Sequence, residues 1–342
     1  MFRRRGAALY MPDLPRPGYP LGGLDFLTYD AGMTPPPPRM PQLLPGELRF
    51  LEGPLGPLAC HVDGPVHAPA LLLLHSINAA ASAHEVAPLY RALRADFRVF
   101  APDLPGFGQS ARPATEYTPA VMTAAIACVM AEIRREQGHS APIDALALSL
   151  SSEFLARVAA ESPVGFRSLA LISPTGFYGD APLLGPPGAT RALPGVRRVL
   201  VRTPLGAWLF KLLVRRGVIR YFLRRTWGRR EIDPAMFEDA VVTAHQPGAM
   251  HAPICFLCGY FFGRDMTRVY QSVQSPVWLV HGVRGDFVDY RLKRLFENNP
   301  DWEFSVRNTG ALPWFEEPAA FIADYRAFLS RVAASTERSG RI

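Results

Sequence analysis

Short apolar runs of strand length, alternating with helical segments, constrain the fold of this chain more than any other sequence feature. Pro69–His75 (PALLLLH) and Pro276–His281 (PVWLVH) are apolar almost throughout, as expected of strands buried on both faces of a sheet. Similar short runs recur along the chain, separated by segments with helical spacing. This alternation predicts a mostly parallel, doubly wound α/β sheet, whose binding sites lie at the carboxyl ends of the strands.

The same pattern places the individual elements and divides the chain. We expect strands at 48–51, 58–62, 69–75, 97–101, 142–148, 166–172, 276–281 and 302–306. We expect helices at about 83–94, 118–136, 151–161, 288–297 and 317–332. A proline-rich arm (1–45) precedes a core formed by 46–178 and 270–334, and a helical insertion (179–269), hereafter the cap, interrupts that core.

The loop after the strand at 97–101 reads APDLPGFGQS from Ala101 to Ser110. It closely resembles the PDLPGFGxS loop of the α/β-hydrolase superfamily, which includes esterases, epoxide hydrolases and haloalkane dehalogenases. The resemblance covers roughly residues 50–178 and 270–332. It implies the α/β-hydrolase fold, with the cap where the family inserts its own, and a catalytic triad in the order serine, acid, histidine.

Residues Ala147-Leu148-Ser149-Leu150-Ser151 correspond to the Gly-x-Ser-x-Gly nucleophile elbow of that family. Ala and Ser are the next smallest residues after Gly, so the tight turn can still form. The resemblance therefore makes Ser149 the nucleophile. Ser151 is an alternative, although Glu153 would then occupy a position that needs a small residue. In a third interpretation, Ser149 fits the turn and has no chemical role.

The stretch His281–Val288 resembles the family's HGxxDxxV segment with one extra residue before the aspartate. This makes Asp286 the candidate acid and Asp289 a weaker alternative. Asp286 also precedes a predicted helix, where aspartate is favoured as an N-cap without any catalytic role.

The histidine of the triad is missing from its expected place. Gly310–Pro318 resembles the family's Gly-His-x-x-x-x-Glu-x-Pro, but Ala311 occupies the histidine position, and a shift of three residues would place Trp314 there. No histidine follows His281 in the sequence. A serine hydroxyl is a poor nucleophile without a base, so the triad implied by the resemblance is incomplete.

Two histidines lie at the carboxyl ends of predicted strands and are candidate substitute bases, namely His75 and His281. The alternative is that each orients a loop. The oxyanion hole depends only on backbone N–H groups, which the resemblance assigns to Leu150 and to Ser76 or Ile77.

Residues 181–230 contain twelve arginines and lysines and no acidic residue, within a chain of formal net charge +7. Thr203, Pro204 and Gly217 bracket a predicted helix. Its apolar stripe consists of Leu205, Trp208, Leu209 and Leu212. Either this stripe packs on the core and the arginines face solvent, or residues 191–230 contact an anionic membrane or admit an amphiphilic acidic ligand. No recognised nucleic-acid-binding motif accompanies the charge, so no nucleic-acid partner is expected.

One spacing resembles a metal site, formed by His245, His251, Cys255 and Cys258. Its surroundings are apolar, so we interpret it as a buried core segment and expect no metal and no cofactor. Four cysteines do not make a disulfide framework in a chain of this length. The N-terminal apolar stretch is too short for a signal peptide, and we expect a cytoplasmic protein that is peripheral to a membrane if the cap binds one.

Three functional hypotheses remain. The first is a diverged α/β-hydrolase that binds a small apolar or amphiphilic ester- or acid-like ligand with weak or no hydrolysis. The second is an active serine hydrolase of the carboxylic-ester type with a relocated base. The third is a non-enzymatic interaction or scaffold protein at a membrane surface.

Overall fold

The computed structural model describes residues 40, 42, 44–162 and 165–339. The proline-rich arm expected at 1–45 lies almost wholly outside the described residues. Within them, no helix is long and apolar enough to cross a membrane.

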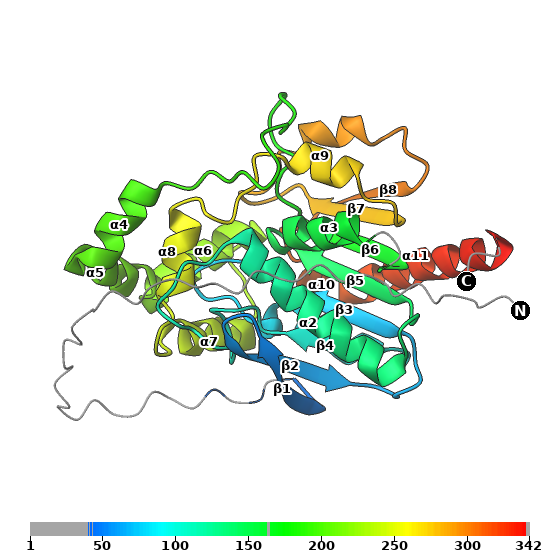
Figure 1. The fold of residues 1–342 in the computed structure, drawn as a ribbon, viewed down its shortest axis with the longest axis horizontal. Coiled ribbons are helices and arrows are strands. Elements are labelled where there is room, and N and C mark those ends of the chain that lie inside the picture. Colours follow the sequence, from blue (N-terminus) through cyan, green and yellow to red (C-terminus); the bar gives the residue numbers. More distant parts are fainter. Residues whose placement is uncertain (1–39, 41, 43, 163–164, 340–342) are drawn as a thin grey trace, which may run out of the picture. The chain divides into compact units, whose positions relative to one another are not determined.

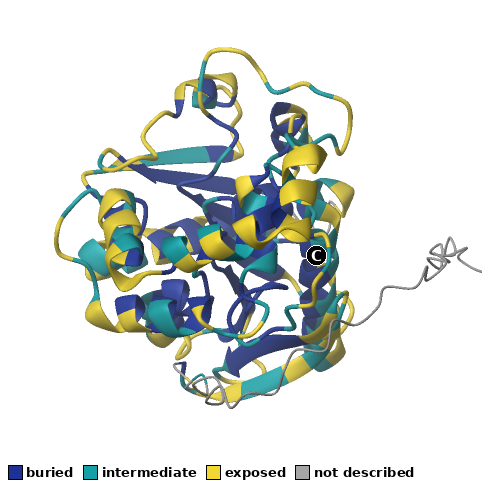
Figure 2. Cartoon of the chain, turned by 90° about the vertical axis from the view of Figure 1, so that its left-hand side faces the viewer, coloured by how far each residue is buried: buried dark blue, intermediate teal, exposed yellow. Residues whose placement is uncertain are grey.

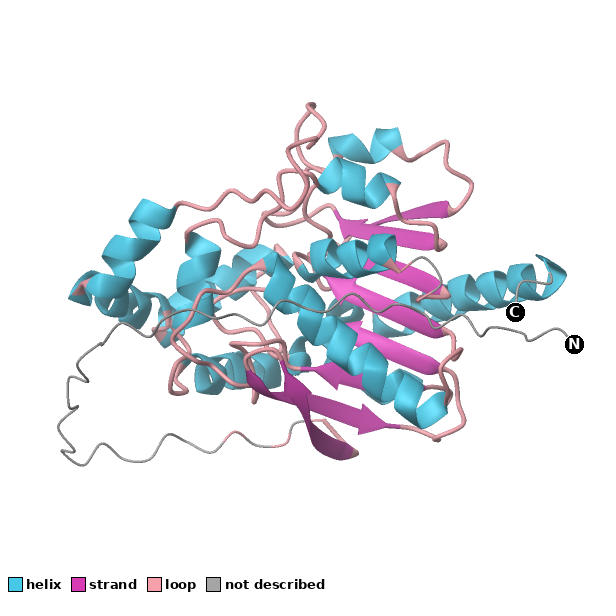
Figure 3. Ribbon diagram, viewed as in Figure 1, coloured by secondary structure: helices cyan, strands magenta, loops and turns pink. Residues whose placement is uncertain are grey.

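An eight-stranded sheet forms the centre of the fold (Figure 3), in the order β1-β2-β4-β3-β5-β6-β7-β8. The strands are β1 (Glu47–Gly53), β2 (Gly56–Asp63), β3 (Ala70–Leu74), β4 (Arg98–Pro102), β5 (Ile143–Leu148), β6 (Ser168–Ile172), β7 (Val277–Gly282) and β8 (Trp302–Arg307). β2 pairs antiparallel with β1 and β4, and every other pair is parallel. The predicted fold class is confirmed, and each expected strand is present.

Helices cover both faces of this sheet (Figure 1). They are α1 (Ala87–Leu93), α2 (Pro119–Gln137), α3 (Ser151–Glu161), α10 (Pro313–Glu316) and α11 (Pro318–Ser339). α2 and α3 pack on one face in one apolar cluster, and α1 and α11 pack on the other face in a second cluster. Leu72 and Leu74 of β3 belong to the first cluster, while Leu71 and Leu73 belong to the second. Successive side chains of a strand point to opposite faces, which is why β3 is an unbroken leucine run.

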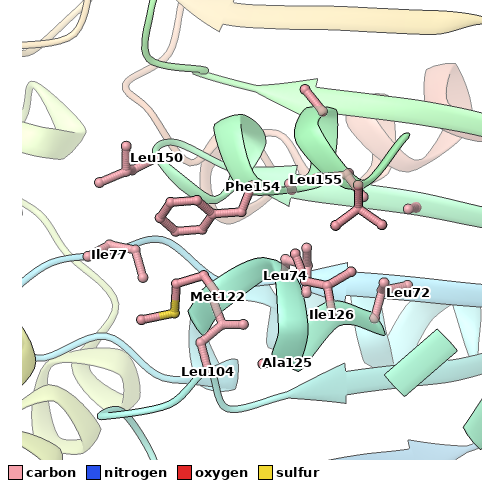
Figure 4. Packing of buried hydrophobic residues seen from close by; sticks show 14 of the residues in the cluster. Leu72, Leu74, Ile77, Leu104, Met122, Ala125, Ile126, Leu150, Phe154 and Leu155 are labelled. Atoms are coloured by element: carbon pink, nitrogen blue, oxygen red, sulfur yellow. The ribbon is translucent and has the colours of Figure 1, made fainter. Parts of the chain in front are cut away.

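Figure 4 shows the first cluster at close range. It labels Met122, Ala125 and Ile126 of α2, Phe154 and Leu155 of α3, and Leu72 and Leu74 of β3. Ile77 and Leu150, which follow β3 and β5, lie in the same cluster. The core therefore extends up to the two loops that the sequence assigns to the oxyanion hole.

The inserted segment forms six helices, five of which lie beyond the carboxyl ends of the parallel strands (Figure 1). They are α4 (Pro194–Arg202), α5 (Pro204–Leu213), α6 (Arg216–Trp227), α7 (Pro234–Ala244), α8 (His251–Leu257) and α9 (Met266–Gln271). α9 instead packs beside α3, where Arg157 pairs with Asp265 at 2.5 Å. A cap of α4 to α8 thus covers the edge of the sheet where a site is expected.

Two local predictions were wrong. The helix expected at 288–297 is only a short 3₁₀ turn, Arg291–Leu295, because the Asp289 carboxylate accepts a hydrogen bond from the Arg291 N–H and competes with helical pairing. The helix expected up to Gly217 ends at Leu213, and Gly217 lies inside α6.

Candidate active site

Ser149 stands at a sharp turn between β5 and α3. Its φ is 57°, a left-handed conformation that residues other than glycine rarely adopt. Its backbone N–H donates to the carbonyl oxygen of Ile172 at 2.8 Å, which fixes the turn to the end of β6. A strained strand-to-helix turn of this kind is the backbone geometry of a nucleophile elbow.

The two serines after the turn are tied to backbone carbonyl groups. Ser151 is fully buried, and its hydroxyl donates to the carbonyl oxygen of His75. The Ser152 hydroxyl donates to the carbonyl oxygen of Ala147 at 3.1 Å. These bonds join the ends of β3 and β5 to the first turn of α3. Ser151, the alternative nucleophile, therefore has its hydroxyl engaged in holding the turn together.

A cavity of about 320 Å³ lies between the core and the cap, and Ser149 is on its wall. The cap lines it with apolar side chains, which are Leu213, Ile219, Phe222, Leu223, Met236, Ala240, Pro253, Phe256 and Leu257. The core adds Ile77, Leu148, Ala311 and Leu312. The volume and the apolar walls suit a small ligand with an apolar body.

The loop after β3 contributes polar groups to this cavity. The N–H of Ser76 donates to the Glu85 carboxylate at 2.7 Å, and the Ser76 hydroxyl donates to the same carboxylate at 3.0 Å. Among the described residues, no acceptor pairs with the backbone N–H of Ile77 or Leu150. The sequence left Ser76 and Ile77 as alternative donors to the oxyanion hole. The N–H of Ser76 already donates to Glu85, whereas, in the described part of the chain, the N–H groups of Ile77 and Leu150 are free to bind a ligand oxygen.

Asp286 also lines the cavity, but its partner is a cap residue. Arg225 of α6 pairs with its carboxylate at 2.7 Å, and the Asp286 N–H donates to the Arg225 carbonyl oxygen at 3.3 Å. The N-cap interpretation is wrong, since no helix begins there. Asp289 is not on the cavity wall and pairs with Arg291 at 2.8 Å. An arginine donates hydrogen bonds but does not accept a proton at physiological pH, so Arg225 is no substitute for a catalytic histidine.

The loop at the histidine position is packed against the same cap helix. The N–H of Ala311 donates to the carbonyl oxygen of Thr226 at 3.0 Å. A Cβ on Gly310 would stand 2.3 Å from the carbonyl oxygen of Trp227, so only glycine permits this approach. Trp314 is fully buried, is not on the cavity wall, and donates its indole N–H to the Glu85 carbonyl oxygen at 2.8 Å.

Neither predicted substitute base lies on the cavity wall. His75 is fully buried; its Nε2 accepts the N–H of Leu104 at 2.9 Å, which leaves Nδ1 to donate to the Ser76 carbonyl oxygen at 2.6 Å. His281 stacks on Tyr290 with ring centres 4.0 Å apart, and its Nδ1 lies 3.0 Å from the Gly282 carbonyl oxygen. Both histidines hold loops in place.

Four buried polar residues on the cavity wall were missed from the sequence, namely Ser82, His84, Glu85 and Asp239, and two of them bear on chemistry and stability. Burial lowers the pKa of His84, and its Nδ1 has no partner among the described residues. The Ser82 hydroxyl donates to Asp239, and burial raises the pKa of that carboxyl to about 7. The polar run at 82–85 directly after the oxyanion loop was a usable signal for His84. Asp239 reaches the cavity only through the packing of α7.

The loop at 101–110, which carries the family resemblance, is held in place by the hydrogen bonds of Asp103. The buried Asp103 carboxylate accepts the N–H groups of Ala83 and Gln109, each at 2.8 Å. Burial opposes its ionisation, but His61, whose Nε2 lies 3.8 Å away, together with His75 and the N–H of Gln109 outweighs that effect and lowers the pKa of Asp103 to about 2. A Cβ on Gly108 would lie within the Asp103 side chain, which explains the glycine of the motif.

The sequence model of the alpha/beta hydrolase family matches residues 71–324. This chain belongs to the alpha/beta hydrolase family. No functionally curated protein sequence matches it.

Several solved structures share the alpha/beta hydrolase fold of this chain. A serine hydrolase involved in carbazole degradation is 17% identical, with a TM-score of 0.64 over 83% of this chain and 98% of that chain. A carboxylesterase from Bacillus subtilis is 18% identical, with a TM-score of 0.64 over 84% and 92%. An enol-lactonase from Burkholderia xenovorans is 19% identical, with a TM-score of 0.61 over 82% and 100%. At such identities the likeness concerns the fold.

The metal-like spacing of the sequence does not form a cluster. Among the described residues, no three His, Cys, Asp or Glu side chains gather as a metal site requires. Cys255 is buried and accepts the N–H of Tyr117 at 3.4 Å, while the His245 ring nitrogen Nδ1 lies 2.7 Å from the Val241 carbonyl oxygen.

Proposed function

We propose that this alpha/beta hydrolase family member binds a small apolar or amphiphilic ligand with an ester or acid group, and hydrolyses it weakly or not at all. The observation that carries the proposal is the cavity of about 320 Å³ with Ser149 on its wall and Ala311 at the family's histidine position. The apolar side chains of the cavity wall would contact the apolar part of the ligand, and the polar loops would bind its ester or acid group.

The backbone around Ser149 supports recognition of a carbonyl or carboxylate oxygen. The N–H groups of Ile77 and Leu150 have no acceptor among the described residues and belong to the two loops that form an oxyanion hole in this family. Backbone donors keep their function whatever side chains surround them. The ligand's oxygen would accept from both, with the apolar part directed toward the cap.

The surroundings of Asp286 support weak or absent hydrolysis. In a working triad the acid orients a histidine that removes the serine proton. Here the acid is paired with Arg225, and the loop that should carry the histidine is bonded to Thr226. Without a base, removal of the proton from Ser149 loses a contribution of about 10²–10⁴-fold in rate.

Ligand binding is tested by displacement of a fluorescent apolar probe with a series of acyl esters and matching carboxylates. Ala240→Phe, which fills the cavity from α7, should abolish displacement. Val242→Phe, at a half-buried position of the same helix that is not on the cavity wall, is the matched control. Equal displacement with both variants would locate the ligand elsewhere and contradict the proposal.

The chemistry is tested by intact-mass labelling with a fluorophosphonate. We expect little or no adduct on the wild type over times at which an active serine esterase is fully labelled. Rapid labelling that Ser149→Ala abolishes would contradict the weak-hydrolysis part of the proposal.

A second candidate function is serine hydrolysis with His84 as the base. It is favoured by one observation: His84 lines the same cavity as Ser149, and its Nδ1 has no partner among the described residues. Its lowered pKa keeps the ring neutral, as a general base requires. Under this alternative, His84→Ala abolishes fluorophosphonate labelling as Ser149→Ala does, while His75→Ala and His281→Ala leave the adduct on any correctly folded protein.

A further inference from the structure

The cap carries an unusual concentration of exposed apolar side chains. Of the eighteen large apolar side chains that are exposed in the described chain, eight lie between Leu193 and Phe222. Those on the helices α4 to α6 are Val196, Val199, Val201, Leu205, Trp208, Tyr221 and Phe222. Figure 2 views the molecule from the cap side and shows exposed residues over the helices that face the viewer. Such a concentration of exposed apolar side chains is typical of an interaction site.

Only half of the predicted stripe packs inward, with Leu209 against the core cluster. Leu205 is 49% exposed and Trp208 is 63% exposed, whereas Leu209 and Leu212 are half-buried. The buried residues of α5 are Gly206 and Phe210. A Cβ on Gly206 would lie 2.1 Å from the Leu200 carbonyl oxygen, so the two helices α4 and α5 form a tight hairpin whose outer side chains face solvent.

Basic side chains are interleaved with these apolar ones. The exposed residues Arg198, Arg202, Lys211, Arg215, Arg220 and Arg224 form no ion pair with any carboxylate of the described residues. Four other basic residues of this stretch do pair with carboxylates, namely Arg197 with Glu116, Arg216 with Glu238, Arg225 with Asp286, and Arg229 with Glu316. We name the exposed apolar and unpaired basic residues of α4, α5 and α6 the cap surface.

We propose that the cap surface docks on the surface of an anionic lipid bilayer, with Trp208 and its apolar neighbours inserted at the headgroup level. Cationic side chains attract anionic headgroups, and apolar side chains between them enter the acyl boundary, which is how interfacial helices bind membranes. Nucleic acid would satisfy the arginines but leave the valine and leucine side chains in water, so the interleaving favours lipid.

The cap surface is continuous with the cavity. Phe222 is exposed on α6 and also lines the cavity, as do the exposed Leu257 and Phe287. A docked cap therefore turns apolar side chains of the cavity wall toward the bilayer. Docking itself does not depend on what the cavity binds, so it can be tested without a ligand and fails or holds separately from the proposed function.

The chain contains its own spectroscopic probe of docking. It has five tryptophans, and four of them, Trp227, Trp278, Trp302 and Trp314, are at most 5% exposed. Trp208 is the exposed one. Insertion of Trp208 into the headgroup region should shift the tryptophan emission to shorter wavelength, and the shift should vanish in Trp208→Phe.

The experiment is cosedimentation of the full-length chain with phosphatidylcholine vesicles with and without phosphatidylglycerol, at low and high salt. We expect binding that requires phosphatidylglycerol, is lost at high salt, and is accompanied by the emission shift. Arg198→Ser with Arg202→Ser should weaken partitioning roughly tenfold or more, since each basic residue near an anionic surface adds attraction. Leu205→Ser with Trp208→Ser should weaken it by a similar factor.

Matched controls separate docking from general charge or misfolding. Arg135→Ser with Arg331→Ser removes the same charge from exposed positions of α2 and α11, and Phe50→Ser removes an exposed ring from β1. All variants change exposed side chains, and thermal unfolding verifies their folding. No binding to anionic vesicles at low salt would overturn the proposal, as would equal loss in test and control pairs. Binding to duplex DNA at least as tight as to vesicles and unchanged by Trp208→Ser would also overturn it, because charge alone would then decide binding.

Discussion

The cap contacts the core on two sides of the cavity, and the two junctions differ in chemistry. On the side of the oxyanion loop, the buried Ser82 hydroxyl donates to the Asp239 carboxyl of α7. On the side of the acid loop, the exposed Arg225 of α6 pairs with Asp286. A buried carboxyl is sensitive to protonation because water does not stabilise its charge, whereas an exposed ion pair contributes little to stability. The first junction should therefore respond to pH, and the second should matter for chemistry more than for stability.

The largest expected effect concerns Asp239. Burial raises its pKa from 3.8 to about 7, although the bond from Ser82 opposes the rise. The folded state then binds a proton that the unfolded state has lost, so this group's contribution to stability is lost as pH rises from about 3.8 to about 7. Asp239→Asn should not show that loss. The free energy of unfolding of the variant, measured relative to wild type, should therefore increase by up to about 4 kcal/mol as the pH is raised from acidic to mildly alkaline.

Urea unfolding at a series of pH values measures this difference. Burial also raises the pKa of Glu153 to about 7, so the wild-type curve contains two such groups and the variant removes one. Asp96→Asn, at an exposed residue paired with Arg326, is the control for the loss of a surface carboxylate. A wild-type-to-variant difference that does not change with pH for Asp239→Asn would show that the first junction does not titrate.

The second largest effect should come from replacing the ion pair of the second junction with a catalytic acid and base. Arg225→Ala combined with Ala311→His releases Asp286 and places an imidazole on the cavity wall. We expect hydrolysis of short p-nitrophenyl esters to rise about 100-fold over wild type, the lower end of what a positioned base supplies. Ala311→His alone should gain less, because Arg225 still holds the acid. Adding Ser149→Ala must abolish the gain, and a folded double variant with no gain would mean that more than the base is missing.

The fold and the elbow were predictable because their determinants are local. A strand buried on both faces needs an unbroken apolar run such as Leu71–Leu74, and the turn at Ser149 needs small neighbours at 147 and 151. Such features leave a pattern that a single sequence displays.

The rest of the site could not be predicted because it depends on contacts between distant segments. Nothing near Asp286 indicates that Arg225, 61 residues away, is its partner. Nothing near Asp239 indicates that α7 buries it against Ser82, 157 residues away. His75 was a reasonable candidate base from its strand-end position, but its two ring nitrogens are taken by backbone groups that only the folded chain brings together. The exposure of Trp208 was unpredictable for the same reason, because it depends on which face of the α4–α5 hairpin packs against the rest of the protein.

A smaller effect tests how closely the second junction is packed. Gly310→Ala would place a Cβ 2.3 Å from the Trp227 carbonyl oxygen, so the loop or α6 must move. We expect a loss of about 1–3 kcal/mol in the free energy of unfolding, as for other overpacked positions. Gly217→Ala in α6, where nothing lies within 4 Å of the added Cβ, is the matched control. It should be neutral or slightly stabilising, because alanine favours helix more than glycine does.

The smallest effect should come from Arg225→Ala alone. Arg225 and Asp286 are both exposed, and exposed ion pairs gain little because water and salt screen them. The urea midpoint should therefore stay within error of wild type at low and high salt. The backbone bond from the Asp286 N–H to the carbonyl oxygen of residue 225 does not require the arginine side chain, so amide exchange should accelerate only slightly around 285–287. A loss as large as that of Gly310→Ala would contradict the comparison, since the ion pair rather than the close backbone packing would then hold this side of the cap.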